Sequence, residues 1–320
     1  MNKQDDHGEK LDAVPREVRA EAPGWFREAL ATPYRVGKVE VQGCSLNVLH
    51  WGDPARPGLL LVHGGAAHAH WWSFLAPMLA RHYYVVAPEL SGHGESGRRV
   101  EYPRQLFADE VMAVLEASHF VGPPVLVGHS MGGMVAIIVA SLYGEQLTGA
   151  VIVDAPVQRP DPESRASSRS NTFRKPGVYA TYEEAMRHFR LVPDQPCEND
   201  YILEHIARHS LKQTEEGWTW KFDPRIFMNI SSRTMSDYLA SVKCRVALMR
   251  GEFSTVVPPE TSEYMYEVLD RDAPLIEIPQ SHHHLILDQP LAFISALRAL
   301  LADWEHSLPR ARRFQAVMGF

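Results

Sequence analysis

Short apolar runs recur along the chain, and each is closed by glycine, proline or polar residues that favour turns. These runs predict buried strands, and the stretches with helical patterning between them predict helices. Strands that alternate with helices favour a mostly parallel sheet with helices on both faces, an α/β fold. The predicted strands are residues 59–62, 83–88, 124–127, 150–153, 246–250 and 275–278, and the predicted helices are residues 72–81, 104–118, 131–143, 259–269 and 290–306.

The alternation defines the expected domain organisation. Residues 35–156 and 240–306 form the predicted core, which opens with an antiparallel pair at 39–41 and 46–51. Residues 157–239 interrupt the pattern with a long Arg-, Ser- and Pro-rich loop followed by helical stretches at 181–191 and 200–211, so an inserted unit is expected there. Residues 1–34 are predicted to be an arm or a helix, and residues 307–320 a C-terminal tail.

The pentapeptide Gly128-His129-Ser130-Met131-Gly132 lies between a predicted strand and a predicted helix. Strand, Gly-x-Ser-x-Gly and helix is the context in which this motif indicates a nucleophile elbow. Glycines two residues to either side allow a turn sharp enough to lift Ser130 Oγ clear of the backbone. The alternative is a glycine-rich turn with an incidental serine, which the flanking segments disfavour.

A second motif, His63-Gly64-Gly65, closes the strand at 59–62. Its glycines allow backbone N–H groups to approach a bound oxygen, so the oxyanion hole is assigned to the N–H groups of Gly65 and Met131. His63 is expected to orient this loop through hydrogen bonds rather than to act as a base.

Aromatic residues follow that loop. Trp71, Trp72 and His129 are candidates for the substrate pocket, and one of the two indoles is expected to pack on a helix instead. His68 and His70 are expected to be surface-loop histidines without a role.

Three adjacent histidines, His282, His283 and His284, follow the last predicted strand. They suggest a metal at first, but consecutive side chains point in different directions and no cysteine or carboxylate stands at ligand spacing. We therefore expect no metal site, and a general base on this loop.

Taken together, these motifs resemble those of a serine hydrolase of the α/β-hydrolase superfamily. The resemblance rests on His-Gly-Gly, Gly-His-Gly-Glu-Ser, Gly-His-Ser-Met-Gly-Gly and His-x-x-x-Leu-Asp-Gln-Pro, which appear in the family order. It implies that residues 157–239 form a cap over Ser130. It also implies that the catalytic histidine lies seven residues before Pro290, which is His283.

The third member of the implied catalytic triad is missing from its usual place. The family acid would fall at Ser254 or Thr255, and neither side chain can carry a negative charge beside the imidazolium. Asp154, which ends the strand at 150–153, is the favoured replacement. Glu252 and a Ser130–His283 dyad without an acid stay open as alternatives.

Composition indicates which binding partners and which cellular compartment to expect. The chain has 320 residues, 45% of them hydrophobic, and a net charge of −7. The absence of a basic face disfavours nucleic acid as a partner. No apolar run approaches the length needed to span a membrane. Three cysteines at long spacings fit a reduced, cytoplasmic protein, expected as a monomer or homodimer.

The expected function is hydrolysis of a small to medium, largely apolar ester, thioester or lactone through an acyl-enzyme, with a small-molecule substrate and no cofactor. Two alternatives use the same Ser130 and His283, namely carbon–carbon bond hydrolysis and perhydrolase activity. A third alternative, from another class, is a ligand-binding protein that kept the scaffold and lost turnover, which the absent acid would explain.

Overall fold

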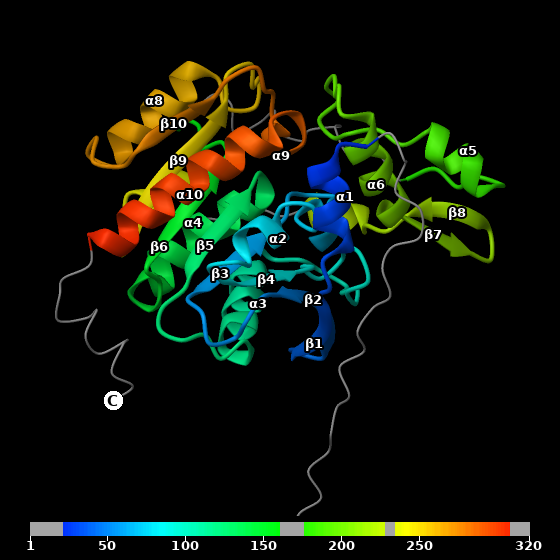
Figure 1. The fold of residues 1–320 in the computed structure, drawn as a ribbon, viewed down its shortest axis with the longest axis horizontal. Coiled ribbons are helices and arrows are strands. Elements are labelled where there is room, and N and C mark those ends of the chain that lie inside the picture. Colours follow the sequence, from blue (N-terminus) through cyan, green and yellow to red (C-terminus); the bar gives the residue numbers. More distant parts are fainter. Residues whose placement is uncertain (1–21, 161–175, 228–233, 308–320) are drawn as a thin grey trace, which may run out of the picture.

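The central element of the fold is an eight-stranded sheet with the order β1-β2-β4-β3-β5-β6-β9-β10. The computed structural model describes residues 22–160, 176–227 and 234–307 (Figure 1). β2 pairs antiparallel with β1 and β4, and every other pair in this sheet is parallel. The strands of the sheet are β1 (Arg35–Val41), β2 (Cys44–Trp51), β3 (Gly58–Val62), β4 (Tyr84–Pro88), β5 (Val125–His129), β6 (Gly149–Val153), β9 (Arg245–Gly251) and β10 (Leu275–Ile278).

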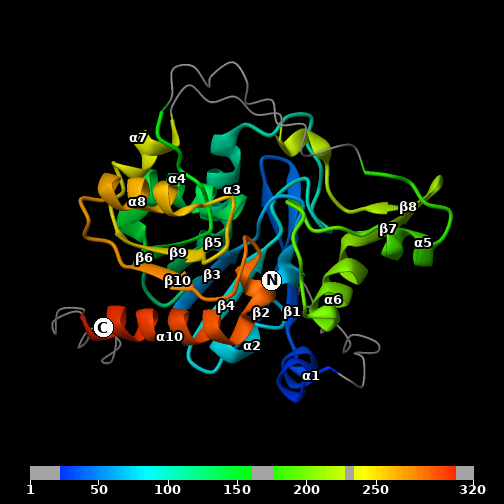
Figure 2. The ribbon, with the colours of Figure 1, turned by 90° about the horizontal axis from the view of Figure 1, so that it is seen from above.

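Helices cover both faces of this sheet, because the side chains of its inner strands alternate between two hydrophobic cores. In β3, Leu59 and Leu61 face one core while Leu60 and Val62 face the other. Figure 2 shows α1, α2 and α10 on one face and α3, α4 and α8 on the other. These helices are α1 (Gly24–Ala31), α2 (Ala76–Leu79), α3 (Arg104–Ala117), α4 (Met131–Tyr143), α8 (Pro259–Val268) and α10 (Pro290–His306), with short η2 (Gly144–Gln146) after α4 and α9 (Leu285–Asp288) before α10.

The segment between β6 and β9, which we call the insertion, contributes no strand to the main sheet within its described residues. Its helices α5 and α6 and its small antiparallel hairpin lie to one side of the sheet in Figure 1, whereas its helix α7 lies beside α4 and α8 in Figure 2. The hairpin was not predicted. The elements of the insertion are α5 (Tyr182–Arg187), α6 (Asp200–Ser210), β7 (Leu211–Thr214), β8 (Gly217–Trp220), η4 (Pro224–Phe227) and α7 (Met235–Leu239).

The α/β fold class and the core elements agree with the sequence prediction, with one correction near the His-Gly-Gly loop. A single helix was expected over residues 72–81, but the chain forms the short helix η1 (Ala69–Trp71) and then α2. Pro77 lies in the first turn of α2. Proline has no N–H group and its ring clashes with the preceding turn, so a helix can begin just before Pro77 but cannot run through it.

Three predicted segments lie partly outside the described residues. The parts concerned are residues 1–21 of the predicted arm, residues 161–175 of the long loop and residues 308–320 of the predicted tail. Within the described residues, no helix has the length and apolar character needed to cross a membrane.

Candidate active site

Ser130 occupies the turn between β5 and α4. Its backbone has φ 54° and ψ −119°, a conformation that residues with a side chain rarely adopt. A Cβ on Gly128 would collide with the carbonyl group of Gly132. A Cβ on Gly132 would in turn collide with the carbonyl oxygens of Val62 and His63. Glycine at both positions therefore permits the sharp turn, which leaves Ser130 partly exposed where β5 ends.

A chain of hydrogen bonds joins Ser130, His283 and Asp154. The distance from Ser130 Oγ to His283 Nε2 is 3.0 Å, and that from His283 Nδ1 to Asp154 Oδ1 is 2.8 Å. His283 is 3% exposed and Asp154 is 1% exposed. A carboxylate only accepts hydrogen bonds, so Nδ1 carries the proton and Nε2 presents its lone pair to the Ser130 hydroxyl.

Asp154 makes the contact with His283 that was proposed for it, while Glu252 points elsewhere. The Ser254 hydroxyl donates to Asp154 Oδ1 at 2.6 Å, and the Gly251 N–H donates to Oδ2 at 2.8 Å. Glu252 Oε2 accepts a hydrogen bond from the backbone N–H of Gln280 at 2.7 Å. The serine at the position of the family acid thus donates to the carboxylate that contacts His283.

The three adjacent histidines have different hydrogen-bond partners, but the rings of His283 and His284 lie close together, with centroids 4.8 Å apart. His282 donates its backbone N–H to Asp288 at 2.8 Å, and its ring is also beside that carboxylate. His284 Nε2 lies 3.2 Å from the Pro193 carbonyl oxygen, in the insertion. Only His283 is hydrogen-bonded to Ser130, which agrees with the spacing to the family proline.

The His-Gly-Gly loop lies against the serine. A Cβ on Gly64 would be 3.2 Å from Ser130 Cβ, so the loop backbone reaches the nucleophile position. Gly65 is partly exposed beside it, and Met131 is the first residue of α4. The role predicted for the N–H groups of Gly65 and Met131, as donors to an oxyanion, stays a prediction.

The two indoles have different surroundings. The Trp71 ring stacks on His129 with centroids 6.3 Å apart and meets the edge of His284 at 5.2 Å. Trp72 is 1% exposed and packs on Phe293 of α10, so it belongs to the hydrophobic core rather than to a pocket wall.

His129 donates from Nε2 to the His283 carbonyl oxygen at 2.9 Å. Burial, and then the neighbouring His283, lowers the pKa of His129 to about 3, so its ring is neutral.

Two other histidines near the loop differ in how well the sequence predicted them. His63 orients the loop as expected: its Nδ1–H donates to the Gly64 carbonyl oxygen at 2.7 Å, and its Nε2 accepts from the Leu90 N–H at 3.1 Å. His68 was expected on a surface loop, which is wrong, because it is 1% exposed and hydrogen-bonded to Ser210 of α6 at 2.9 Å. The insertion covers this loop, which the local sequence does not reveal.

A model of the alpha/beta hydrolase family matches residues 59–296, which include the serine, the histidine and the aspartate of the hydrogen-bonded chain. The chain belongs to the alpha/beta hydrolase family. It is 26% identical over 278 residues to a serine hydrolase-like protein of Danio rerio, covering 78% of this chain and 83% of that protein. It is 25% identical over 272 residues to Esterase Rv0045c of Mycobacterium tuberculosis, covering 82% and 88% of the two chains. Its fold matches the crystal structure of E-2-(acetamidomethylene)succinate hydrolase with a TM-score of 0.72 and 19% identity, covering 84% of this chain and 99% of that one.

In this alpha/beta hydrolase, the sequence did not predict the contacts that hold the histidine loop against the insertion. Gln195 Oε1 accepts from the backbone N–H of His284 at 2.9 Å, and Gln195 Nε2 donates to Asp288. Asn199 Nδ2 donates to the Leu287 carbonyl oxygen at 2.7 Å. Both residues lie in a polar stretch that resembles any loop, so no local signal marks them.

Proposed function

We propose that this alpha/beta hydrolase is a serine hydrolase that cleaves a small to medium, largely apolar carboxylic ester, thioester or lactone through an acyl-enzyme. The observation that carries the proposal is the hydrogen-bonded chain from Ser130 through His283 to Asp154. The strained backbone at Ser130 supports it as well, because such strain persists where the surrounding structure maintains it for function.

In the proposed reaction, Ser130 Oγ attacks the carbonyl carbon while His283 Nε2 takes the hydroxyl proton. The N–H groups of Gly65 and Met131 stabilise the oxyanion, at about 3 kcal/mol for each donor. His283 then gives its proton to the leaving alcohol or thiol. In the second half, His283 activates water, which releases the acid from Ser130.

Asp154 stays ionised in this scheme, holds the Nδ1–H tautomer of His283 and stabilises the imidazolium that forms in each half-reaction. The preference for an apolar substrate follows from the indole of Trp71 and the neutral ring of His129 beside the histidine loop. The similarity to a serine hydrolase-like protein and to an esterase agrees with this chemistry.

The test combines covalent labelling with turnover. Wild-type protein is expected to react with a fluorophosphonate probe and to hydrolyse p-nitrophenyl esters. Ser130→Ala should abolish both, and His283→Ala should abolish turnover while the fold, measured by circular dichroism, is kept. The double variant should lose little more than either single variant, because the two residues act as a unit.

Matched controls come from the same chain. Ser295→Ala removes an exposed hydroxyl on α10, and His282→Ala removes the histidine next to the proposed base. Both variants should keep substantial activity. Ester turnover that survives in Ser130→Ala would exclude the proposal, and a wild-type protein that binds esters without labelling or turnover would favour a ligand-binding role.

A further inference from the structure

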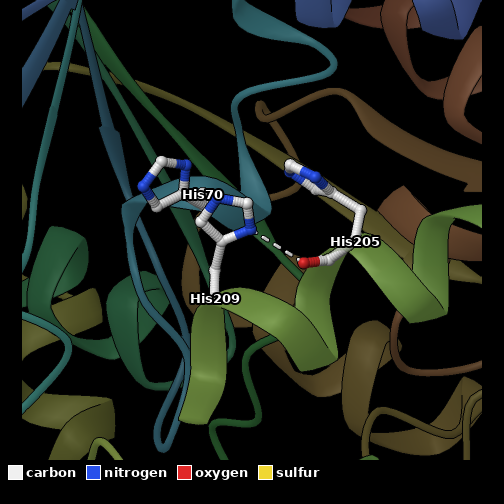
Figure 3. Close-up of side chains that lie close together, drawn as sticks. All are labelled: His70, His205 and His209. Atoms are coloured by element: carbon white, nitrogen blue, oxygen red, sulfur yellow. Dashed lines mark hydrogen bonds between the residues drawn. The ribbon is translucent and has the colours of Figure 1, made fainter. Parts of the chain in front are cut away.

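A group of three histidines lies outside the proposed active site. It consists of His70 from η1 and of His205 and His209 from α6, and one ring nitrogen of each lies within 4.8 Å of the others (Figure 3). His205 and His209 are four positions apart on one helix, so they project from the same helix face. The group therefore joins the segment after the His-Gly-Gly loop to the insertion.

The three rings are packed closely. The centroids of His70 and His209 are 3.9 Å apart with the rings nearly parallel, and those of His205 and His209 are 4.4 Å apart. Such a cluster of polar rings calls for a physical explanation, because each imidazole keeps one nitrogen lone pair that needs a partner.

The hydrogen bonds of the cluster define which nitrogen carries that lone pair. His209 Nδ1–H donates to the His205 carbonyl oxygen at 2.8 Å, the contact drawn in Figure 3, and this leaves His209 Nε2 as an acceptor. The Ser73 hydroxyl donates to the His70 carbonyl oxygen at 2.9 Å, so it accepts from His205 Nε2–H at 2.8 Å. His205 Nδ1 is then the free lone pair. Outer hydrogen bonds of this kind are what orient histidines that bind metals.

The charge of the cluster is compatible with cation binding. The hydrogen bonds leave His205 and His209 each with one unprotonated ring nitrogen, and neutral imidazole is the form that binds a cation. Two cationic side chains lie near the cluster, Lys221 close to His70 and His209 and Arg208 close to His205 and His209. Lys221 is paired with the Glu95 carboxylate and Arg208 with the Glu204 carboxylate, which offsets their repulsion of a cation.

We propose that His70, His205 and His209 form a binding site for Zn²⁺ that ties η1 to α6. Three imidazoles suit a tetrahedral zinc ion with water in the fourth position, at about 2.0–2.1 Å from each nitrogen. Binding requires ring rotations that bring the three nitrogens, which lie within 4.8 Å of one another, to that distance from one ion. Because Trp71 belongs to η1 and stacks beside the histidine loop, the ion holds one wall of the proposed active site against the insertion.

A second group, His129, His283 and His284, also has ring nitrogens within 4.8 Å of one another. It is the competing site that the experiment must separate. Both ring nitrogens of His283 are already hydrogen-bonded, to Ser130 and Asp154, so zinc binding there would break at least one of these hydrogen bonds. His205 and His209 keep their hydrogen bonds to Ser73 and to the His205 carbonyl oxygen when their other ring nitrogens bind an ion.

The test uses the full chain, stripped with a chelator and dialysed against buffered Zn²⁺. We expect one bound zinc per chain by metal analysis, and a higher melting temperature with Zn²⁺ than with Mg²⁺, because an ion that binds only the folded state stabilises it. Co²⁺ should give the visible absorption of a four-coordinate ion with nitrogen ligands.

His205→Gln and His209→Gln should each weaken zinc binding by about 100-fold or more, while His284→Gln should bind as the wild type does. His209 is partly exposed, so His209→Gln decides the result if His205→Gln fails to fold. Zinc binding that survives in His209→Gln, or that is lost in His284→Gln, overturns the proposal. Neither outcome depends on ester turnover, so failure of the zinc site is distinguishable from failure of the proposed hydrolase.

Discussion

Asp154 is a buried carboxylate that accepts hydrogen bonds from three donors. Its backbone has φ 46°, a left-handed conformation at the end of β6 that turns the side chain towards the histidine loop. Oδ1 accepts from His283 and Ser254, and Oδ2 accepts from Gly251. Burying a charge is costly unless it is paired and hydrogen-bonded, so these three donors make an ionised Asp154 tolerable.

Asp154→Asn should lower kcat for a p-nitrophenyl ester by about 10⁴-fold while leaving the fold intact. The amide cannot stabilise the imidazolium, and it favours the wrong His283 tautomer. Glu252→Gln is the matched control and should retain near wild-type kcat, because Glu252 is bound to the Gln280 N–H instead. The assignment fails if Glu252→Gln is the variant that loses activity.

At this scale, the sequence predicted the serine and the histidine but left the acid open. The motif spacing identified Ser130 and His283 because both stand in fixed positions relative to glycine and proline. Asp154 was one of several candidates, since the sequence does not show which carboxylate turns towards a histidine 129 positions away. The histidine pair on α6 carried a usable signal, the four-residue spacing, but its contact with His70 depends on tertiary packing.

The turn between β5 and α4 shows at the scale of elements why glycine is needed. β3, β5 and the start of α4 approach so closely that the backbone of β3 occupies the space of a Cβ at Gly132. The same closeness brings the His-Gly-Gly loop against Ser130. The turn and the loop are therefore packed against each other, so a substitution that displaces one should also displace the other.

Gly132→Ala should lower the free energy of unfolding by about 1–3 kcal/mol, because the methyl group must displace backbone rather than a flexible side chain. It should also abolish most ester turnover by moving Ser130. Gly24→Ala, at the first residue of α1, is the control: nothing lies within 4 Å of its Cβ, so its stability should change by less than about 1 kcal/mol. Urea unfolding of both variants measures the difference, and equal effects would contradict this account.

The predictability of the elements follows from their burial. β3, β5 and β6 are buried throughout and mainly apolar because helices cover both faces, and this gives the strongest sequence signal. The β7–β8 hairpin was missed, since its strands have only four residues each and are partly exposed, although Trp218 and Trp220 alternate with polar residues in β8. The pattern of apolar residues therefore predicts the elements that are buried in the core. It fails for elements that form through contacts with neighbouring elements.

The whole molecule buries several neutral imidazoles, and its stability should depend on pH as a result. His63 is the clearest case, because its Nε2 must stay unprotonated to accept the Leu90 N–H. Burial lowers the pKa of His63 well below 6.5, whereas the unfolded chain takes up a proton near 6.5. Between the lowered pKa of folded His63 and pH 6.5, the unfolded state thus binds more protons than the folded state does. The contribution of His63 to stability is therefore present above this range and is lost as the pH falls through it.

The free energy of unfolding of the wild type should therefore exceed that of His63→Gln, and this gap between the two should be largest near pH 8. Towards about pH 5 the gap should shrink by up to about 1.4 kcal/mol per pH unit. Denaturant unfolding at several pH values measures the gap. Val127→Ala is the control, because it removes buried methyl groups and no titratable one. A gap for His63→Gln as independent of pH as that for Val127→Ala would refute the argument.

The hydrogen bond between Ser254 and Asp154 also bears on how such a site can change over evolutionary time. Ser254, the position at which the family resemblance places the acid, is in direct contact with Asp154, 2.6 Å from hydroxyl to carboxylate. Two substitutions can therefore move the acid from the end of β6 to the loop after β9. Ser254→Asp first creates two carboxylates that share one proton, since like charges this close cannot both ionise. Loss of Asp154 then completes the exchange, and the base keeps an anionic partner at every stage.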